Sequence, residues 1–251
     1  MTTESLPPEL EHSHSPDAIR ARLQNDPEHS YLRDFIYGAV DGAVTTFAVV
    51  SGVAGAGLAP NIVIVLGVAN LIGDGFSMAA GNYLGTKAEA EQREKTRLME
   101  HRHIAHSPDG EREEIRQIYA AYGFEGALLE QIVTVITSDK NRWVNTMLRE
   151  EFGLSSISPN PFKSAAATFI AFILIGAIPL LPFVANLLIP FSGTYLISTL
   201  MTGIAFFAVG AAKSKFVEQH WAIAGAETLI VGAIASGFAY LCGWVLQGIV
   251  A

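Results

Sequence analysis

Cysteine and charge are both scarce in this sequence, and each shortage excludes a class of protein. Cys242 is the only cysteine, so neither a disulfide nor a cysteine-ligated zinc site can form within one chain. It lies in an apolar run, where we expect a small buried side chain. Charged residues make up only 16% of the chain and hydrophobic residues 50%. This composition is too apolar for an ordinary soluble domain and is typical of a membrane protein with a soluble insert.

Positive charge is scarcer than negative charge, and long stretches carry no charge at all. The 24 aspartates and glutamates outnumber the 16 lysines and arginines, and the resulting net charge of −8 argues against nucleic-acid binding. No charged residue lies between Ser164 and Ala212, and none follows Glu227. The acidic balance therefore belongs to the segments outside these stretches.

The apolar stretches are long enough to cross a membrane as helices, which takes about 20 residues. We predict an all-α membrane protein with five transmembrane helices and a cytoplasmic helical metal-binding insert between the second and third. Pro179 and Pro182 interrupt the third helix. The predicted transmembrane helices cover residues 37–57, 62–84, 162–187, 190–212 and 221–250.

The same pattern divides the chain into four parts. Residues 1–30 are rich in proline, serine, histidine and acids, and they predict a disordered cytoplasmic tail with one short helix over residues 16–24. Residues 31–85 hold the first two transmembrane helices, residues 86–160 the insert and residues 161–251 the last three. Charged or amphipathic segments in the insert predict helices over residues 87–106, 111–123, 125–137 and 141–152, with a turn at residues 107–110.

The distribution of lysine and arginine predicts the orientation. These residues occur before the first span, between the second and third, and between the fourth and fifth, whereas the other loops and the C-terminus have none. The positive-inside rule then places the tail and the insert in the cytoplasm and the C-terminus on the far side. The tail shows no organelle address, and we favour a bacterial inner membrane.

Asp41 is the only charged residue of the first predicted span. A carboxylate inside a membrane helix costs roughly 2.5–3.5 kcal/mol on insertion scales, so its presence points to a function. Helical spacing places it in a stripe of small and polar side chains with Thr45 and Gly52, and such a stripe lets another helix approach closely. The alternative is that Asp41 lies near the helix end and reaches water.

The second span repeats this arrangement, with Asn70, Asp74 and Met78 on one face. If the two faces pack together, Asp41, Asp74 and Met78 line one path, in which carboxylate and thioether groups replace the hydration shell of a metal ion. A carboxylate there can also exchange a proton for a metal ion. The alternatives are a helix–helix hydrogen bond for Asp74 and ordinary packing for Met78, and Asn70 can serve either role.

Three pairs of potential metal ligands have helical spacing in the insert, so that each pair presents two donor groups on one helical face. Carboxylate oxygens, an imidazole and a thioether together suit a first-row divalent ion such as Fe²⁺ or Mn²⁺. For each pair alone, the alternative is a solvated acidic face paired with arginines, or core packing for the methionine. The pairs are Glu100 with His103, Glu111 with Glu114, and Met147 with Glu151.

Three segments also carry a resemblance to a known family: YGAVDGAVTTFAVVSG in the first span, GDGFSMAAGNYLGTKAE in the second, and WVNTMLREEFGL at the end of the insert. They are similar to the vacuolar iron transporter family, and the similarity covers nearly everything from Tyr31 to the C-terminus. It implies a five-span homodimer that moves Fe²⁺ out of the cytosol against protons, with the pathway between the protomers.

The resemblance also implies roles for single residues. Asp41 and Met78 match the family's pathway carboxylate and methionine. His103 stands where the family has a glutamate, and Asn70 stands where it has a second-span glutamate, with Asp74 supplying a carboxylate one turn later. The residues that match the metal-ligand pattern of the insert are Glu100, Glu111, Glu114, Met147 and Glu151.

We therefore predict a transporter of divalent metal, with Fe²⁺ first and Mn²⁺ as a second candidate, that works by exchange with protons and is not an enzyme. The metal is its substrate, and no permanently bound cofactor is expected. Its partners are a second copy, the bilayer, metal ions and protons. One alternative is a membrane-tethered di-iron oxidase, but that fold needs two Glu-x-x-His elements and only Glu100-x-x-His103 is found. The other is a metal sensor, whose membrane anchor would not need Asp41.

Overall fold

The computed structural model describes residues 15–24, 29–155, 158–215 and 219–250 of the chain. Every regular element within these ranges is a helix, and five stretches are long and apolar enough to cross a membrane. The prediction of an all-α membrane protein with five spans is confirmed. The predicted disordered tail falls mostly outside the described residues, although α1 (Pro16–Gln24) forms the short helix expected within it.

The other four spans pack around α2, which contacts α3, α7, α9 and α10. It begins at Leu32, five residues before the predicted start. The third span bends where its prolines predict. Pro179 lies in a short 3₁₀ turn and Pro182 opens the next helix, positions that tolerate a missing backbone N–H. The spans are α2 (Leu32–Gly55), α3 (Pro60–His106), α7 (Pro161–Gly176) with η1 (Ile178–Leu180) and α8 (Leu181–Leu188), α9 (Thr194–Lys213) and α10 (Trp221–Val250).

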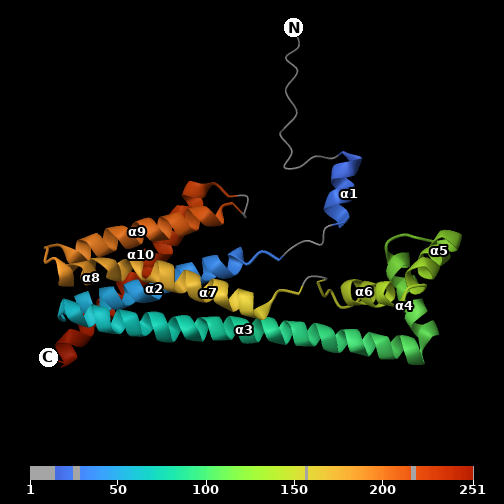
Figure 1. Cartoon of the computed structure of the whole chain (residues 1–251), viewed down its shortest axis with the longest axis horizontal. Helices are drawn as coiled ribbons and strands as arrows, with labels where there is room; N and C mark the ends of the chain where they lie inside the picture. Colours follow the sequence, from blue (N-terminus) through green and yellow to red (C-terminus); the bar gives the residue numbers. More distant parts are fainter. Residues whose placement is uncertain (1–14, 25–28, 156–157, 216–218, 251) are drawn as a thin grey trace, which may run out of the picture.

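The prediction of separate helices over residues 62–84 and 87–106 is wrong. A single helix, α3, runs from Pro60 to His106 and extends along the molecule from the membrane bundle to the insert (Figure 1). At 1.5 Å per residue its 47 residues span about 70 Å. The change from apolar to charged side chains near Thr86 does not end the helix, because no proline interrupts the backbone there. It marks the edge of the apolar part of α3.

The insert is a small helical unit packed on the far end of α3 (Figure 1). It comprises α4 (Pro108–Ala121), α5 (Gly126–Thr137) and α6 (Lys140–Glu150). The predicted turn at residues 107–110 is confined to Ser107, since Pro108 already occupies the first turn of α4, where its fixed φ favours a helix. The unit has its own apolar core, which is separate from the core of the bundle. Helix α3 contributes Ile104 to the core of the insert.

Glycine allows the membrane helices to pack backbone against backbone. A Cβ added at Gly42 of α2 would lie 2.5 Å from the Phe172 carbonyl oxygen of α7. On another side of α2, a Cβ at Gly55 would lie 2.1 Å from the Tyr240 carbonyl oxygen of α10. Neither position has room for a side chain. Helix association in lipid relies on such close approach.

Candidate functional site

The closest group of potential metal ligands lies where α3 ends and α4 begins. The imidazole Nδ1 of His103 is 3.4 Å from Oε1 of Glu111 and 3.8 Å from Oε1 of Glu100. Glu100 is only 1% exposed and Glu111 only 4%, whereas about half of the His103 side chain faces solvent. Two buried carboxylates therefore lie beneath one partly exposed imidazole, and one ligand atom of each residue lies within 4.8 Å of the other two. We refer to Glu100, His103 and Glu111 as the insert cluster.

The helical break at Ser107 creates this juxtaposition. Glu100 and His103 lie in the last turns of α3, three residues apart on one face. Glu111 lies in the first turn of α4, and its backbone N–H donates to the Ser107 carbonyl oxygen. A carboxylate in the first turn of a helix also gains from the unpaired amide groups there. The break thus brings the end of one helix and the start of the next onto a common site.

Other carboxylates surround the insert cluster. Burial, followed by the charges of Glu111 and Glu151, raises the pKa of Glu100 to about 8. Burial and the charge of Glu114 also raise the pKa of Glu111. The pKa of Glu151 is raised by burial and then by Glu114 and Glu111, and the imidazole of His103 opposes the increase. Four carboxylates therefore share one local field, which protons or a cation can neutralise.

Two oxygen atoms of the insert cluster are buried without a hydrogen-bond partner. They are Oε2 of Glu100 and Oε2 of Glu111. Leaving a buried polar atom unpaired costs roughly 1–3 kcal/mol, and more when the atom is charged. A divalent cation held by the two carboxylates would give such atoms a partner. Carboxylate oxygens suit Mn²⁺, and the imidazole of His103 beside them adds a donor that suits Fe²⁺.

The raised pKa of Glu100 predicts that the metal-free protein becomes less stable as pH rises. Between about 4.5, the ordinary value, and about 8, the folded chain holds more protons than the unfolded chain, so the free energy of unfolding falls with pH. Glu100→Gln should remove much of that fall. Thermal unfolding in detergent with a chelator, at pH 5.5 and 8.5, measures it as a difference of several degrees. Glu89→Gln, an exposed site on α3, should keep the wild-type slope, and an unchanged slope in Glu100→Gln would contradict the assignment.

The remaining predicted donors of the insert are arranged less tightly. Glu114 and Glu151 are exposed and reach the cluster through their charges. Met147 is fully buried in the apolar core of the insert, in the same cluster as Ile104 and Ile115. Core packing accounts for its burial. A ligand role for these three residues stays a prediction.

The predicted pathway stripes of α2 and α3 do face each other inside the bundle. The Asn70 amide on α3 donates to the hydroxyl of Thr45 at 3.2 Å and to that of Thr46 at 3.5 Å. The Thr45 hydroxyl in turn donates to the backbone carbonyl of Asp41 at 3.0 Å. The carboxylates of Asp41 and Asp74 are close enough to interact electrostatically. We call Asp41, Thr45, Asn70 and Asp74 the membrane cluster.

Met78 lies one helical turn after Asp74 on α3 and is half-buried. It packs against the apolar core of the bundle, which agrees with ordinary packing. Its spacing also keeps it on the face that carries Asn70 and Asp74. Its role as a sulfur ligand stays a prediction.

Parts of the two stripes remain open within one chain. On α2, Gly38 is covered by the Thr168 backbone of α7 and Gly52 approaches the Ala239 carbonyl of α10, yet Asp41 between them is only half-buried. On α3, a Cβ added at either Gly81 or Gly85 would meet no described atom within 4 Å. The small-residue surface predicted for helix packing is thus only partly used inside one chain.

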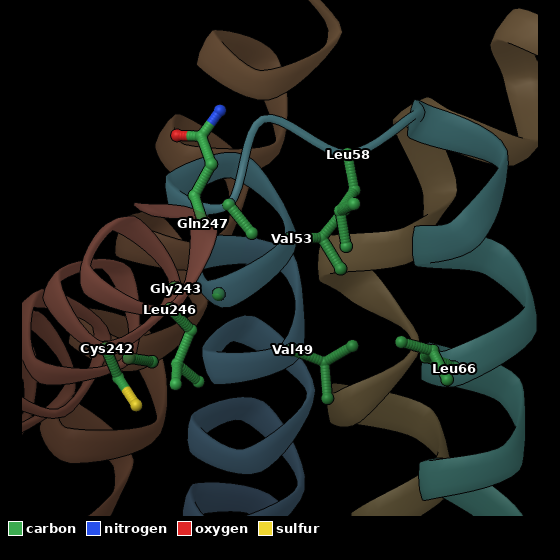
Figure 2. Close-up of a pocket in the computed structure, with 11 residues that line it drawn as sticks. Val49, Val53, Leu58, Leu66, Cys242, Gly243, Leu246 and Gln247 are labelled. Atoms are coloured by element: carbon green, nitrogen blue, oxygen red, sulfur yellow. The ribbon is translucent and has the colours of Figure 1, made fainter. Parts of the chain in front are cut away.

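A groove of about 700 Å³ continues this face beyond the membrane cluster (Figure 2). It runs between α10 and α3, with Val49 and Val53 of α2 at its centre and Leu66 of α3 at one edge. Cys242 lies at the opposite edge, on α10, and is exposed. The prediction that Cys242 is buried is wrong. Only one side of α10 packs against the bundle, and Cys242 does not lie on that side.

The structure shows a second polar contact between α2 and α3, which the sequence pattern did not predict. Asn82 donates to the Asp34 carboxylate at 3.0 Å and to the Thr168 hydroxyl of α7 at 2.7 Å. Asp34 precedes Asp41 by seven residues, a spacing that keeps both on one helical face. The spacing of seven residues is the sequence signal that points to Asp34. The prediction misses it because the first span is predicted to begin only at residue 37.

Comparison with known proteins agrees with this architecture. The sequence model of the VIT family matches residues 32–244, most of the chain. The chain belongs to the VIT family. Among relatives, it is 33% identical to vacuolar iron transporter 1 of Arabidopsis thaliana over 218 residues, which is 86% of each chain. It is also 31% identical to the vacuolar iron transporter of Centaurea cyanus, over 87% of this chain and 91% of the relative.

A third relative gives a similar match within the VIT family. The vacuolar iron transporter of Toxoplasma gondii is 30% identical over 95% of this chain and 83% of the relative. These findings confirm the resemblance stated from the three sequence segments. The names of these relatives are those of transporters, which agrees with the prediction that this chain is not an enzyme.

Proposed function

We propose that this VIT-family protein moves divalent transition-metal ions, Fe²⁺ first and Mn²⁺ as a second candidate, out of the cytosol in exchange for protons. The observation that carries the proposal is the presence of two polar clusters on one continuous helix. The insert cluster lies at the end of α3 outside the bundle, and the membrane cluster lies on α3 inside it. A capture site joined to a membrane path is what a transporter requires.

The insert cluster supports the capture of metal from the cytosol. It offers carboxylate and imidazole donors, two of which are buried and have unpaired oxygen atoms. The nearby Glu114 and Glu151 increase the negative potential that attracts a cation. In this proposal the insert is cytoplasmic and the C-terminus is on the far side, because the loops bearing lysine and arginine then face the cytoplasm.

The membrane cluster supports exchange. Two carboxylates, Asp41 and Asp74, interact inside an apolar bundle, where two uncompensated negative charges are costly. Either protons or a divalent cation can compensate them, and the two compete for the same oxygen atoms. The amide oxygen of Asn70 and the thioether of Met78 complete the donors on this face. Competition of this kind makes metal movement in one direction drive proton movement in the other.

The open parts of the two stripes support a homodimer with the path between its protomers. At Gly81 and Gly85 an added Cβ would meet no described atom within 4 Å, and small residues of this kind allow a second copy to approach α3 closely. A second copy would also cover the half-buried Asp41, which a single chain leaves partly open. A bacterial inner membrane is the location we favour.

A di-iron oxidase is less well supported. Across the described ranges, one group of three or more His, Cys, Asp or Glu side chains can hold a metal ion, and it contains a single Glu-x-x-His element. The carboxylate-bridged di-iron fold needs two. A sensor with a passive membrane anchor does not require the hydrogen-bonded contact of Asn70 with Thr45 and Thr46.

Transport in liposomes tests the proposal directly. Purified protein in liposomes, with Fe²⁺ kept reduced outside and an acidic lumen, should accumulate metal while the lumen becomes less acidic. A metal-sensitive dye and a pH-sensitive dye inside the same vesicles measure the two fluxes. Collapsing the proton gradient with an ionophore should slow uptake severalfold. Equal uptake with and without the gradient would rule out proton exchange, and no uptake above protein-free vesicles would rule out transport.

A further inference from the structure

The third donor of the insert cluster differs in kind from the other two. Glu100 and Glu111 supply oxygen atoms from buried positions, whereas His103 supplies a nitrogen atom from the solvent side. Its Nδ1 faces one oxygen of each carboxylate, at 3.8 and 3.4 Å. An ion entering between the carboxylates from solvent therefore meets the imidazole. The two buried Oε2 atoms without a hydrogen-bond partner are a second observation that points to a ligand here.

The kind of donor matters because several cations compete for a group of carboxylates. Mg²⁺ and Ca²⁺ are hard ions that prefer oxygen ligands, and Mg²⁺ loses its water reluctantly. Fe²⁺, Co²⁺ and Zn²⁺ bind imidazole well. A site made only of carboxylates attracts all of these ions by charge. One imidazole among the carboxylates lowers the negative charge and adds a ligand that only the transition metals use well.

We propose that His103 is the specificity-determining ligand of the insert cluster, which favours transition-metal ions over Mg²⁺ and Ca²⁺. The inference deepens the proposed function and rests on it, since it concerns the capture site of the transporter. Glu114 and Glu151 carry the attraction, and they do not discriminate among divalent cations. Discrimination comes from the one nitrogen ligand at the entrance.

Competition binding with the full-length protein in detergent tests this. Co²⁺ serves as the probe, because its visible absorption reports ligands and it is stable in air. The part of Co²⁺ binding that Glu111→Gln abolishes defines the insert cluster. Titration of Mg²⁺ or Ca²⁺ against bound Co²⁺ then gives a selectivity ratio. In His103→Glu this ratio should fall by about tenfold or more, a typical size for changes around a metal ligand.

His106→Glu is the matched control. His106 also lies at the end of α3 and is exposed, but its Nδ1 is 2.8 Å from the Arg102 carbonyl oxygen and it is not part of the cluster. The substitution makes the same change of charge as His103→Glu. Because it removes no donor from the cluster, it should leave the selectivity ratio within about twofold of wild type. An equal fall in both variants would mean that charge alone sets selectivity, and the inference would be wrong.

The remaining outcomes separate the inference from the proposed function. If wild-type protein binds Co²⁺ in a manner that requires Glu111, and His103→Glu leaves the selectivity ratio unchanged, only the role of His103 is overturned. If wild-type protein shows no Co²⁺ binding that depends on Glu111, the capture site fails and the inference fails with it. A red shift or loss of the Co²⁺ absorption in His103→Gln, as expected when a weaker-field oxygen donor replaces nitrogen, would support a nitrogen ligand at this position, and an unchanged spectrum would count against it.

Discussion

Replacing Glu111 and Glu114 together with glutamine should remove tight metal binding by the insert while the protein stays folded. Glu111 supplies a buried carboxylate to the insert cluster, and Glu114 adds its charge to the same field. Changing a single residue around a metal ligand commonly weakens binding about 10- to 100-fold, so the loss of both carboxylates should exceed that range. Calorimetric titration of the full-length protein with Co²⁺ or Mn²⁺ measures the change.

Glutamine is chosen because it keeps the size of glutamate and can accept and donate hydrogen bonds. The relief of repulsion among buried carboxylates should leave the double variant at least as stable as wild type, and size-exclusion chromatography together with thermal unfolding checks this. Glu113→Gln is the matched control, because Glu113 lies on the same helix and pairs with Arg116 on the outer surface. Wild-type affinity in the double variant would show that these glutamates do not hold the metal ion.

The fold was predictable to the extent that composition determines it. Uncharged stretches of about 20 residues predict membrane helices, because the bilayer penalises every buried charge. Prolines 179 and 182 predict the break in the third span. The continuity of α3 was not predictable in the same way, because the composition changes near Thr86 while the helix continues. Side-chain composition indicates whether a segment lies in lipid or in water. The ends of a helix depend instead on helix-breaking residues and caps, and no proline interrupts α3 near Thr86.

The candidate sites were predictable within a helix but not between helices. Spacings of three residues correctly place Glu100 beside His103 on one face. They also pair Glu111 with Glu114, whereas the structure places Oε1 of Glu111 3.4 Å from Nδ1 of His103, across the break at Ser107. The angle between α3 and α4 depends on packing in the insert core, which no local pattern specifies. The same reason explains why the sequence does not predict the contact of Asn82 with Asp34.

Asp41 is the residue whose replacement should affect transport most. It lies on the helix at the centre of the bundle and interacts with Asp74 across the contact between α2 and α3. The neighbouring Thr45 hydroxyl bonds its backbone carbonyl and accepts from Asn70, so the backbone there is held in place without the carboxylate. Removing the charge of Asp41 should therefore change the chemistry of the path more than its structure.

Asp41→Asn keeps the shape of the side chain and removes its ability to exchange a proton for a metal ion. We expect a protein that folds, binds metal at the insert with wild-type affinity, and shows a proton-driven flux of Fe²⁺ or Mn²⁺ reduced by about 100-fold or more, since the carboxylate that interacts with Asp74 in the path is lost. Flux into liposomes with an acidic lumen measures the change, and calorimetry on the same sample measures insert binding. Asp109→Asn, on the exposed surface of the insert, should transport like wild type.

Comparison with Met78→Leu separates charge from coordination in the path. Leucine keeps the volume of methionine and loses the sulfur, so this variant should slow transport less than Asp41→Asn, because Met78 cannot exchange a proton. Slow flux with intact proton coupling in Met78→Leu, and lost coupling in Asp41→Asn, would assign ligation to one residue and exchange to the other. Wild-type flux in Asp41→Asn would make Asp41 structural. The coupling group would then have to be Asp74, the other carboxylate of the membrane cluster, and Asp74→Asn would be the variant that loses proton-driven transport.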